Sequence, residues 1–253
     1  MQSLAGKTVL ITGASGTVGQ ACLETFLGRG AQIVLTDLAA PPAQWLAHEN
    51  VWFQAADVTD RKAVNAVFEA ALQRFGRIDA AVLAAGMEGF VGPVEDISEA
   101  DIDRVLAVNV KGCLFWMQAC LRHMKSRGSG SIVALSSISG MVGTASMAAY
   151  TASKHAVVGL VRAAALESGR HGVRINAVCP GPIESEMMRR IDQALADQDP
   201  QRLGGRADAS RGLPTQRYVS AAEVAAMIAF LCGDEAGSCH GGAYMVAGGF
   251  TAK

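Results

Sequence analysis

The stretch KTVLITGASGTVG, residues 7–19, decides the fold because it joins an apolar strand to a glycine-rich turn and then to a helix. Glycines in such a turn allow a pyrophosphate to approach the free N–H groups of the following helix, whose dipole favours negative charge. A strand before the turn and a helix after it are the context that dinucleotide binding requires. The stretch therefore predicts a dinucleotide site, with contacts from Gly13, Ser15, Thr17, Val18 and Gly19.

Short apolar runs alternate with helical stretches along the chain. The runs predicted as strands are 7–12, 31–37, 51–56, 79–84, 131–136, 174–179 and 243–246, and the predicted helices are 18–28, 60–75, 100–125, 150–169 and 221–232. Because the strands are apolar almost throughout, both faces of the sheet should be covered. The pattern predicts an α/β fold: a doubly wound, Rossmann-type parallel sheet of about seven strands with helices on both faces, in a single domain.

Residues 183–217 interrupt this alternation and are rich in Arg, Asp, Gln and Gly. We expect this segment of the single domain 1–253 to cover the crevice beyond the strands as a substrate lid, which would exclude water during a reaction. The alternative is a solvated helical excursion without a gating role, since mobile loops are common on protein surfaces.

The composition argues against several classes of partner. The 253 residues carry a formal net charge of −1 with Lys and Arg scattered, so we expect no nucleic acid and no membrane partner. No apolar run reaches the roughly 20 residues that span a bilayer. Six widely spaced cysteines without a Cys-x-x-Cys pair indicate reduced core residues, and the sequence contains no His/Cys cluster for a metal. These features predict a soluble, cytoplasmic protein.

Asp37 ends the second predicted strand, where a carboxylate can accept hydrogen bonds from the adenosine ribose. The same charge would repel the additional phosphate of NADP, and neither Ser15 nor Leu38 supplies a cation, so NAD is the predicted cofactor. Asp57 is predicted to meet the adenine amino group, although an acid before a helix also serves as a cap. The further contacts expected beyond the strand ends are Val58, Ala84, Ala85 and Gly86.

Tyr150 and Lys154 are spaced i, i+4, which places both side chains on one helix face. A phenol titrates near 10, about three units above neutrality, but a neighbouring ammonium favours the phenolate, so we expect Lys154 to lower the pKa of Tyr150. Ser137 follows the apolar run 131–136, where its hydroxyl could hold a substrate oxygen. Taken alone, a Tyr-x-x-x-Lys pattern is frequent by chance, and Tyr150 could be an amphipathic interface residue.

Together these motifs resemble the short-chain dehydrogenase/reductase family, in its compact single-domain branch, over essentially the whole chain. The resemblance implies that the catalytic residues are Asn109, Ser137, Tyr150 and Lys154. It also implies that Lys154 binds the nicotinamide ribose and that Asn109 organises a water-linked proton path. The family's turn beside the nicotinamide corresponds to Pro180 and Gly181, with Ile183 and Ser185 near the carboxamide.

The chain departs from the family where Leu83-Ala84-Ala85-Gly86 replaces an Asn-Asn-Ala-Gly motif. The side-chain hydrogen bonds that steady the central strand must therefore come from other residues. Glu88, shortly after this motif, could add a polar contact, but a single acid in a loop usually faces solvent, so it is interpreted as solvent-facing. The resemblance further implies a homotetramer. Two helical stretches appear more apolar than one sheet contact needs, through Leu114, Phe115, Trp116, Val157, Val158, Leu160 and Val161.

The predicted function is NAD-dependent hydride transfer between the nicotinamide and a hydrophobic or amphipathic secondary alcohol or ketone. The predicted substrate contacts are Ser137, Ser139, Met141, Met147, Tyr150 and Met187. Three alternatives remain open: an NADPH-dependent 3-oxoacyl-type reductase, an epimerase or dehydratase that retains its cofactor, and a non-catalytic dinucleotide-binding scaffold. The joint presence of Ser137, Tyr150 and Lys154 argues against the scaffold, which need not keep them together.

Overall fold

The computed structural model describes residues 4–198 and 213–252. Seven strands pair in parallel in the order β3-β2-β1-β4-β5-β6-β7. The strands are β1 (Thr8–Thr12), β2 (Gln32–Thr36), β3 (Val51–Phe53), β4 (Ala80–Leu83), β5 (Gly130–Leu135), β6 (Val173–Pro180) and β7 (Ala243–Val246). The chain runs outward from β1 to β3 and then returns to β4, so the topological switch point lies between β1 and β4. Ligands of open α/β sheets bind beyond the carboxyl ends of the strands at such a point.

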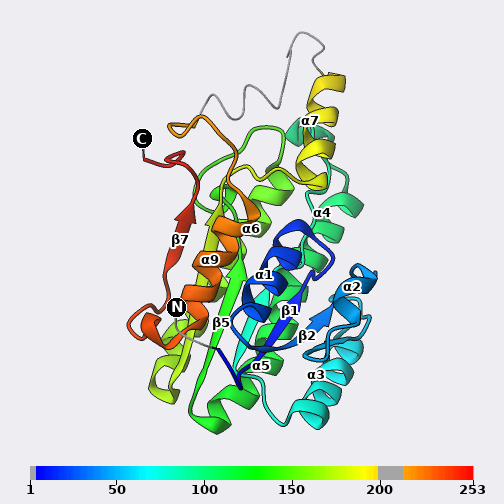
Figure 1. Cartoon of the computed structure of the whole chain (residues 1–253). Helices are drawn as coiled ribbons and strands as arrows, with labels where there is room; N and C mark the ends of the chain where they lie inside the picture. Colours follow the sequence, from blue (N-terminus) through cyan, green and yellow to red (C-terminus); the bar gives the residue numbers. More distant parts are fainter. Residues whose placement is uncertain (1–3, 199–212, 253) are drawn as a thin grey trace.

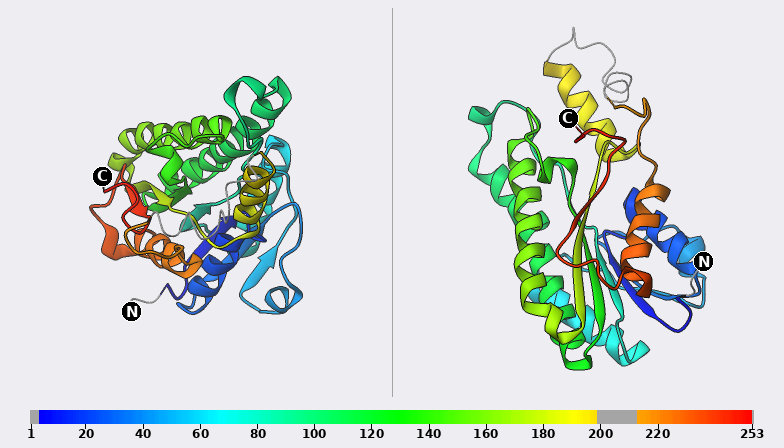
Figure 2. Two further views of the ribbon diagram at one scale, coloured as in Figure 1. Left: turned by 90° about the horizontal axis from the view of Figure 1, so that it is seen from above. Right: turned by 90° about the vertical axis from the view of Figure 1, so that its left-hand side faces the viewer.

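Helices cover both faces of the sheet. The right-hand view of Figure 2 shows α1 and α9 on one side of the strands and α6 on the other, and Figure 1 shows the same elements with their labels. The helices are α1 (Thr17–Leu27), α2 (Ala43–Leu46), α3 (Arg61–Phe75), α4 (Glu99–Leu106), α5 (Cys113–Arg127), α6 (Ala148–Ser168), α7 (Glu186–Gln198) and α9 (Ala221–Cys232). This arrangement confirms the predicted doubly wound α/β fold.

Two apolar cores lie between the sheet and these helices. One core joins α1 and α9 to the sheet, and the other joins α3, α5 and α6 to its opposite face. All five residues of β1 are buried, as are the four residues of β4, whereas β7 at the edge is only half-buried. The central strands are therefore mostly apolar, with only Thr8 and Thr12 polar in β1, because neither of their faces meets water.

The helix predicted over 100–125 is interrupted. A π-helical turn, Ala107–Gly112, separates α4 from α5 and contains the buried Asn109. A π-turn inserts an additional residue into a helix, and such turns are frequent at functional sites. Hydrophobic spacing alone did not reveal the interruption.

The segment predicted as a lid contains a helix that the sequence reading did not place. Helix α7 begins after Ser185, whose hydroxyl accepts a hydrogen bond from the Met188 amide at 3.1 Å and so caps it. Its apolar side packs against Val91, Met147 and Tyr150. Residues 199–212 of the predicted lid lie outside the described residues.

Asp79, immediately before β4, connects three parts of the structure. Its carboxylate accepts hydrogen bonds from the Thr8 amide at 2.9 Å, from Arg77 Nε at 2.8 Å and from Arg127 Nη1 at 3.1 Å. Burial alone would raise the pKa of Asp79, but these hydrogen bonds outweigh it and hold the pKa below its ordinary value. The ionised carboxylate therefore stabilises the folded state.

We predict that Asp79→Asn lowers the free energy of unfolding at pH 7 by roughly 1 to 3 kcal/mol. Because the folded-state pKa is depressed, this contribution is present above the unfolded pKa and is lost as the pH falls through the folded pKa. The difference between Asp79→Asn and the wild type should therefore shrink in acid, as urea titrations at pH 7 and below about 4 would measure. Asp103→Asn, at an exposed position, is the control. A difference that stays constant with pH would contradict the assignment.

Candidate active site

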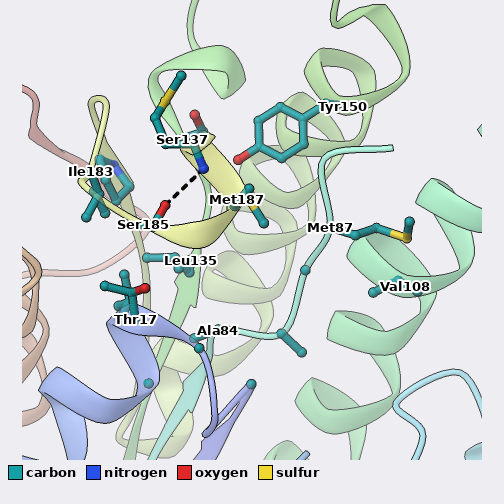
Figure 3. A pocket seen from close by; sticks show the side chains of 18 of the residues that line it. Thr17, Ala84, Met87, Val108, Leu135, Ser137, Tyr150, Ile183, Ser185 and Met187 are labelled. Atoms are coloured by element: carbon teal, nitrogen blue, oxygen red, sulfur yellow. Dashed lines mark hydrogen bonds between the residues drawn. The ribbon is translucent and has the colours of Figure 1, made fainter. Parts of the chain in front are cut away.

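A cavity of about 730 Å³ lies beyond the carboxyl ends of the strands. All the residues predicted to contact the cofactor line it, which brings together Gly13, Ser15, Thr17, Val18, Gly19, Asp37, Asp57, Val58, Ala84, Ala85, Gly86, Tyr150, Lys154, Pro180, Gly181, Ile183 and Ser185. In Figure 3, Thr17 and Ala84 line one end of this cavity, and Tyr150, Ser137 and Met187 lie toward the other. One cavity therefore joins the predicted dinucleotide site to the predicted catalytic groups.

The glycine turn leaves room for close backbone approach. Gly13 has a φ of +67°, and a Cβ built there would lie 2.7 Å from the amide nitrogen of Ala85. A Cβ at Gly19 would lie 2.2 Å from the Gly13 carbonyl oxygen, which no side chain tolerates. Helix α1 begins after Gly16 without a side-chain cap, so its first amides remain available. These features fit the pyrophosphate of a dinucleotide at this helix terminus.

Asp37 is held at the carboxyl end of β2 by two amides. The Ser15 amide donates to Oδ2 at 2.9 Å, and the Leu38 amide donates to Oδ1 at 2.7 Å. Each carboxylate oxygen keeps a further lone pair for the cavity, which suits a ribose hydroxyl as donor. Leu38 also lines the cavity and is 73% exposed, so it adds apolar surface at this end.

Asp57 is not the cap of the helix that follows it. Asp60 caps α3 by accepting from the Lys62 and Ala63 amides, whereas Asp57 Oδ1 accepts from the amide and the hydroxyl of Thr59, both at 2.8 Å. The Asp57 side chain is thereby fixed in a turn beside the cavity.

Thr12 supplies hydrogen bonds where the chain lacks the family's asparagines. Its hydroxyl oxygen accepts from the Ala84 amide at 3.1 Å and from the Ala85 amide at 3.2 Å. These bonds tie the end of β4 to the end of β1 at the switch point. The hydrogen bonds that replace those of the missing asparagines therefore come from Thr12, in the neighbouring strand β1.

Ser137, Tyr150 and Lys154 lie on one wall of the cavity. Ser137 follows β5, and Tyr150 lies in the first turn of α6 with Lys154 one turn later. Lys154 is only 4% exposed; its ammonium donates to the Leu135 carbonyl at 2.9 Å and lies 5.5 Å from the centre of the Tyr150 ring. Figure 3 shows the Tyr150 hydroxyl pointing into the cavity beside Ser137.

Close packing between β5 and α6 sets this wall. The Ser136 hydroxyl donates to the Lys154 carbonyl at 3.0 Å, and a Cβ at Gly140 would lie 2.8 Å from the same carbonyl oxygen. Only glycine at residue 140 permits this approach. The wall therefore has little freedom to move.

The pKa of Tyr150 corrects the expectation drawn from its spacing to Lys154. Burial raises the pKa of Tyr150 to about 12, a hydrogen bond with Ser137 opposes this rise, and the charge of Glu88 adds to it. Burial also lowers the pKa of Lys154 to about 8, against smaller opposing effects of Cys113 and Cys179. Desolvation is the largest effect on both groups, and it favours their neutral forms. The net shift of the Tyr150 pKa is therefore upward, opposite to the direction expected from its spacing to Lys154.

Asn109 is buried and does not line the cavity. Its amide nitrogen donates to the Met87 carbonyl at 2.9 Å and to the Ser153 hydroxyl at 3.0 Å, and its Oδ1 accepts from the Met87 amide at 2.8 Å. Both amide hydrogens are therefore occupied in fixing the loop after β4 to α6. The water-linked proton path implied for Asn109 stays a prediction.

The substrate half of the cavity differs in part from the expectation. Ser137, Ser139, Met147, Tyr150 and Met187 line the cavity, but Met141 does not, and Met141 is 38% exposed. Met141 lies just after the turn Ile138–Gly140.

Sequence reasoning missed several lining residues on α7 and the turns beside it. Glu88, interpreted as solvent-facing, is buried and forms an ion pair with Arg190 of α7. The additional lining residues include Leu38, Val108, Ile138, Thr144, Met188, Arg190 and Ile191. The apolar spacing of Met187, Ile191 and Leu195 was a helical signal that could have located α7.

The apolar helix faces are covered in part within one chain. Trp116, Val157, Val158 and Val161 are at most 3% exposed and belong to the core beneath α5 and α6. Leu114, Phe115 and Leu160 of the same helices are half-buried, and Leu166 of α6 is 90% exposed. The argument for a tetramer from these helices stays a prediction.

Other kinds of site are not indicated. Within residues 4–198 and 213–252, no three His, Cys, Asp or Glu side chains are grouped so that they could hold a metal ion. Over the same ranges, no helix is both long and apolar enough to pass through a membrane.

Comparison with known proteins identifies the family. A family model described as "Enoyl-(Acyl carrier protein) reductase" matches residues 13–251. The chain belongs to the short-chain dehydrogenase/reductase family. It is 34% identical to levodione reductase of Leifsonia aquatica over 97% of this chain and 94% of that protein. The crystal structure of levodione reductase superposes with a TM-score of 0.92, covering 98% of both chains at 34% identity.

Two further members of the family differ in the cofactor that they hold. An NAD⁺-bound xylitol dehydrogenase is 30% identical, with a TM-score of 0.90 over 98% of this chain and 100% of that one. ElxO with NADP bound is also 30% identical, with a TM-score of 0.89 over 98% of this chain and 99% of that one. Membership of the family therefore establishes a nicotinamide dinucleotide oxidoreductase without deciding between NAD and NADP.

We predict that Lys154→Met changes how stability depends on pH. The unfolded chain keeps this lysine protonated to about pH 10.5, whereas the folded chain releases the proton near 8, so wild-type stability rises with pH between these values. The stability of Lys154→Met relative to the wild type should therefore fall by roughly 2 kcal/mol between pH 7 and 9.5, as measured by urea unfolding. Lys111→Met, which removes an exposed ammonium, is the control. If the stability of Lys154→Met relative to the wild type instead rose with pH, burial would not disfavour the charged form of Lys154.

Proposed function

We propose that this protein is an NAD-dependent oxidoreductase that transfers a hydride between the nicotinamide and a hydrophobic or amphipathic secondary alcohol or ketone. The observation that carries the proposal is one continuous cavity that has the glycine turn and Asp37 at one end and Ser137, Tyr150 and Lys154 at the other. A scaffold that only bound the dinucleotide would not need these three side chains on a shared wall.

The chain's own groups would handle the proton and the substrate oxygen. With a pKa raised to about 12, Tyr150 is a neutral phenol at pH 7, ready to donate a proton to the oxygen of a ketone that accepts hydride. Ser137 would hold the same oxygen by a hydrogen bond. In the oxidative direction, the positive charge of the oxidised nicotinamide would favour the phenolate. Lys154 would bind the nicotinamide ribose from its place beneath the Tyr150 ring.

NAD is the proposed cofactor because of the charges at the adenosine end. Asp37 points a carboxylate at that end, and the neighbouring lining residues Ser15, Leu38, Asp57 and Val58 carry no positive charge. The cations among the described lining residues are Lys154 and Arg190, which lie at the catalytic end. An additional phosphate would therefore meet repulsion without compensation.

The proposed substrate follows from the apolar surroundings of Tyr150. Val91, Met147 and Ile191 form a small core that Tyr150, Met187 and Met188 join. Unbranched methionine side chains adapt to varied apolar shapes, which suits a hydrophobic substrate body. Levodione reductase and xylitol dehydrogenase carry names that imply a ketone and an alcohol, which supports that part of the proposed class.

The remaining parts of the proposal concern organisation and place. We propose that residues 1–253 form one domain in which 183–217 act as the substrate lid; α7 over the cavity supports the lid. We also propose a homotetramer, on the basis of family membership alone. A cytoplasmic location fits the six free cysteines, since a reducing compartment keeps thiols unpaired.

Tyr150→Phe should abolish turnover, with a loss of at least about 100-fold, because the proton donor is removed. Binding of NADH should stay within about twofold, since the ring remains. Nicotinamide absorbance measures turnover across a panel of alcohols and ketones, and fluorescence titration measures binding. Tyr244→Phe, in β7 and outside the cavity, is the matched control. Unchanged turnover in Tyr150→Phe would reject the proposed role.

Asp37→Ala should shift the cofactor preference. We expect kcat/KM with NAD to fall roughly tenfold, because a charged hydrogen-bond acceptor is lost, and kcat/KM with NADP to rise, because repulsion is removed. Steady-state rates with both cofactors give the ratio. Asp96→Ala, an exposed acid away from the cavity, should leave the ratio unchanged. A wild-type enzyme that works only with NADPH would overturn the choice of NAD.

A further inference from the structure

An ion pair between Glu88 and Arg190 forms part of the wall around the catalytic end of the cavity. Arg190 Nε and Nη2 each donate to a different oxygen of Glu88, the second at 3.2 Å, so the pair has the two-pronged geometry of strong guanidinium–carboxylate pairs. The Glu88 side chain is 12% exposed and the Arg190 side chain 56%. The acid is thus committed to this partner while the cation still borders solvent.

The pair connects two segments that are remote in sequence. Glu88 lies in the loop after β4, and Arg190 lies in the second turn of α7. Farther along α7, the Gln198 amide donates to the Val91 carbonyl, so the helix is attached to the same loop at two points. Ile191 packs between these two points against Val91 and Met147. The position of Arg190 above the cavity is therefore well defined.

The pair also lies where the main cavity adjoins a smaller one of about 380 Å³, with Met87 lining both. Arg190 lines both cavities, and Glu88 lines the smaller one. The charge of Glu88 reaches the reacting end. Burial is the largest cause of the raised pKa of Tyr150, the Ser137 hydrogen bond opposes that rise, and the charge of Glu88 adds to it. A charge left unbalanced at this wall would therefore act on a substrate held at Tyr150.

Two further charged residues, Asp101 and Arg104, line the smaller cavity beside the pair. The Asp101 carboxylate accepts a hydrogen bond from the Ser98 hydroxyl at 2.6 Å, and Arg104 is exposed.

The charged residues of the main cavity are engaged or exposed as well. Lys154 donates to the Leu135 carbonyl beneath the Tyr150 ring. Glu186 is 75% exposed and faces Arg189 at 3.4 Å. Among the described residues that line the cavity, Arg190 carries the one guanidinium, and Glu88 neutralises it.

We propose that Glu88 and Arg190 together determine substrate specificity: their mutual neutralisation makes the enzyme select uncharged alcohols and ketones and discriminate against molecules that carry a carboxylate near the reacting carbon. This inference rests on the proposed oxidoreductase function and narrows its substrate class. Glu88 is thereby a specificity residue whose removal leaves an unpaired cation facing the substrate. Specificity of this kind arises because the Glu88 carboxylate cancels the charge of the Arg190 guanidinium, which would otherwise attract a carboxylate on the substrate.

The test compares two inhibitors of the same shape, cyclohexanecarboxylate and cyclohexanecarboxamide, against whichever neutral alcohol the enzyme oxidises best. Inhibition constants are measured for the wild type, Glu88→Gln, Arg190→Gln and the double variant. Glutamine at residue 88 keeps an acceptor for Arg190 and changes only the charge. The readout is the ratio of the carboxylate constant to the carboxamide constant, which a general weakening of the lid would leave unchanged.

We expect Glu88→Gln to improve carboxylate binding relative to carboxamide by roughly tenfold, a moderate effect because solvent screens the half-exposed guanidinium. Arg190→Gln should shift the ratio in the opposite direction, since it leaves Glu88 unpaired. The double variant should return to the wild-type ratio. Because Arg190 borders solvent, Arg190→Gln provides the test even where Glu88→Gln fails to fold.

The outcomes separate this inference from the proposed function. No oxidation or reduction of any alcohol or ketone by the wild type with either cofactor would overturn the proposed function itself. Activity with neutral substrates, combined with ratios that are equal in all foldable variants or that shift the same way in both single variants, would overturn the specificity role alone. Failure of both inhibitors to bind any active variant would also overturn it.

Discussion

The close approach of β1 to the end of β4 is the constraint on which the site depends. Gly13 passes so near the Ala85 backbone that a methyl group would not fit, and the Thr12 hydroxyl receives the Ala84 and Ala85 amides. The contact lies where the strand order reverses, so the loops after β1 and β4 diverge from it. The cavity opens between these loops, with the uncapped start of α1 below it. Each later feature of the site is placed relative to this contact.

Burial, more than pairwise attraction, sets the chemistry on the catalytic wall. Lys154 is held under the Tyr150 ring by the Leu135 carbonyl, in a place where an ammonium is poorly solvated. The pKa of Tyr150 is raised and that of Lys154 is lowered, so both groups favour their neutral forms more than they would in water. Because these groups are poorly solvated, a new charge nearby, from a cofactor ring or from a substrate, shifts their pKa values strongly. The same reasoning gives weight to the neutralised pair of Glu88 and Arg190.

Features of the site that depend on residues close together in the sequence could be predicted, whereas those that depend on contacts between distant segments could not. The strands were predictable because burial on both faces requires continuous apolar runs, and the cofactor residues because they follow directly after those runs. Met141 was expected beside the substrate, but it follows the turn Ile138–Gly140 and does not line the cavity. The apolar residues of α5 and α6 suggested a partner, and the structure divides them: Trp116 and Val161 are covered by their own chain, whereas Leu160 is half-buried and Leu166 is exposed. Composition alone cannot tell which neighbour covers an apolar face.

The sequence by itself determined the doubly wound sheet, the position of the glycine turn and the set of residues that gather beyond the strands. These depend on local patterns, namely hydrophobic period, glycine spacing and the order of strands and helices. Only the tertiary structure decided that Thr12 supplies the contacts of missing asparagines, that Asn109 is occupied with the Met87 backbone, and that Glu88 meets Arg190. Each of these contacts joins segments far apart in the chain, and their energies depend on burial and orientation, which exist only once the chain has folded.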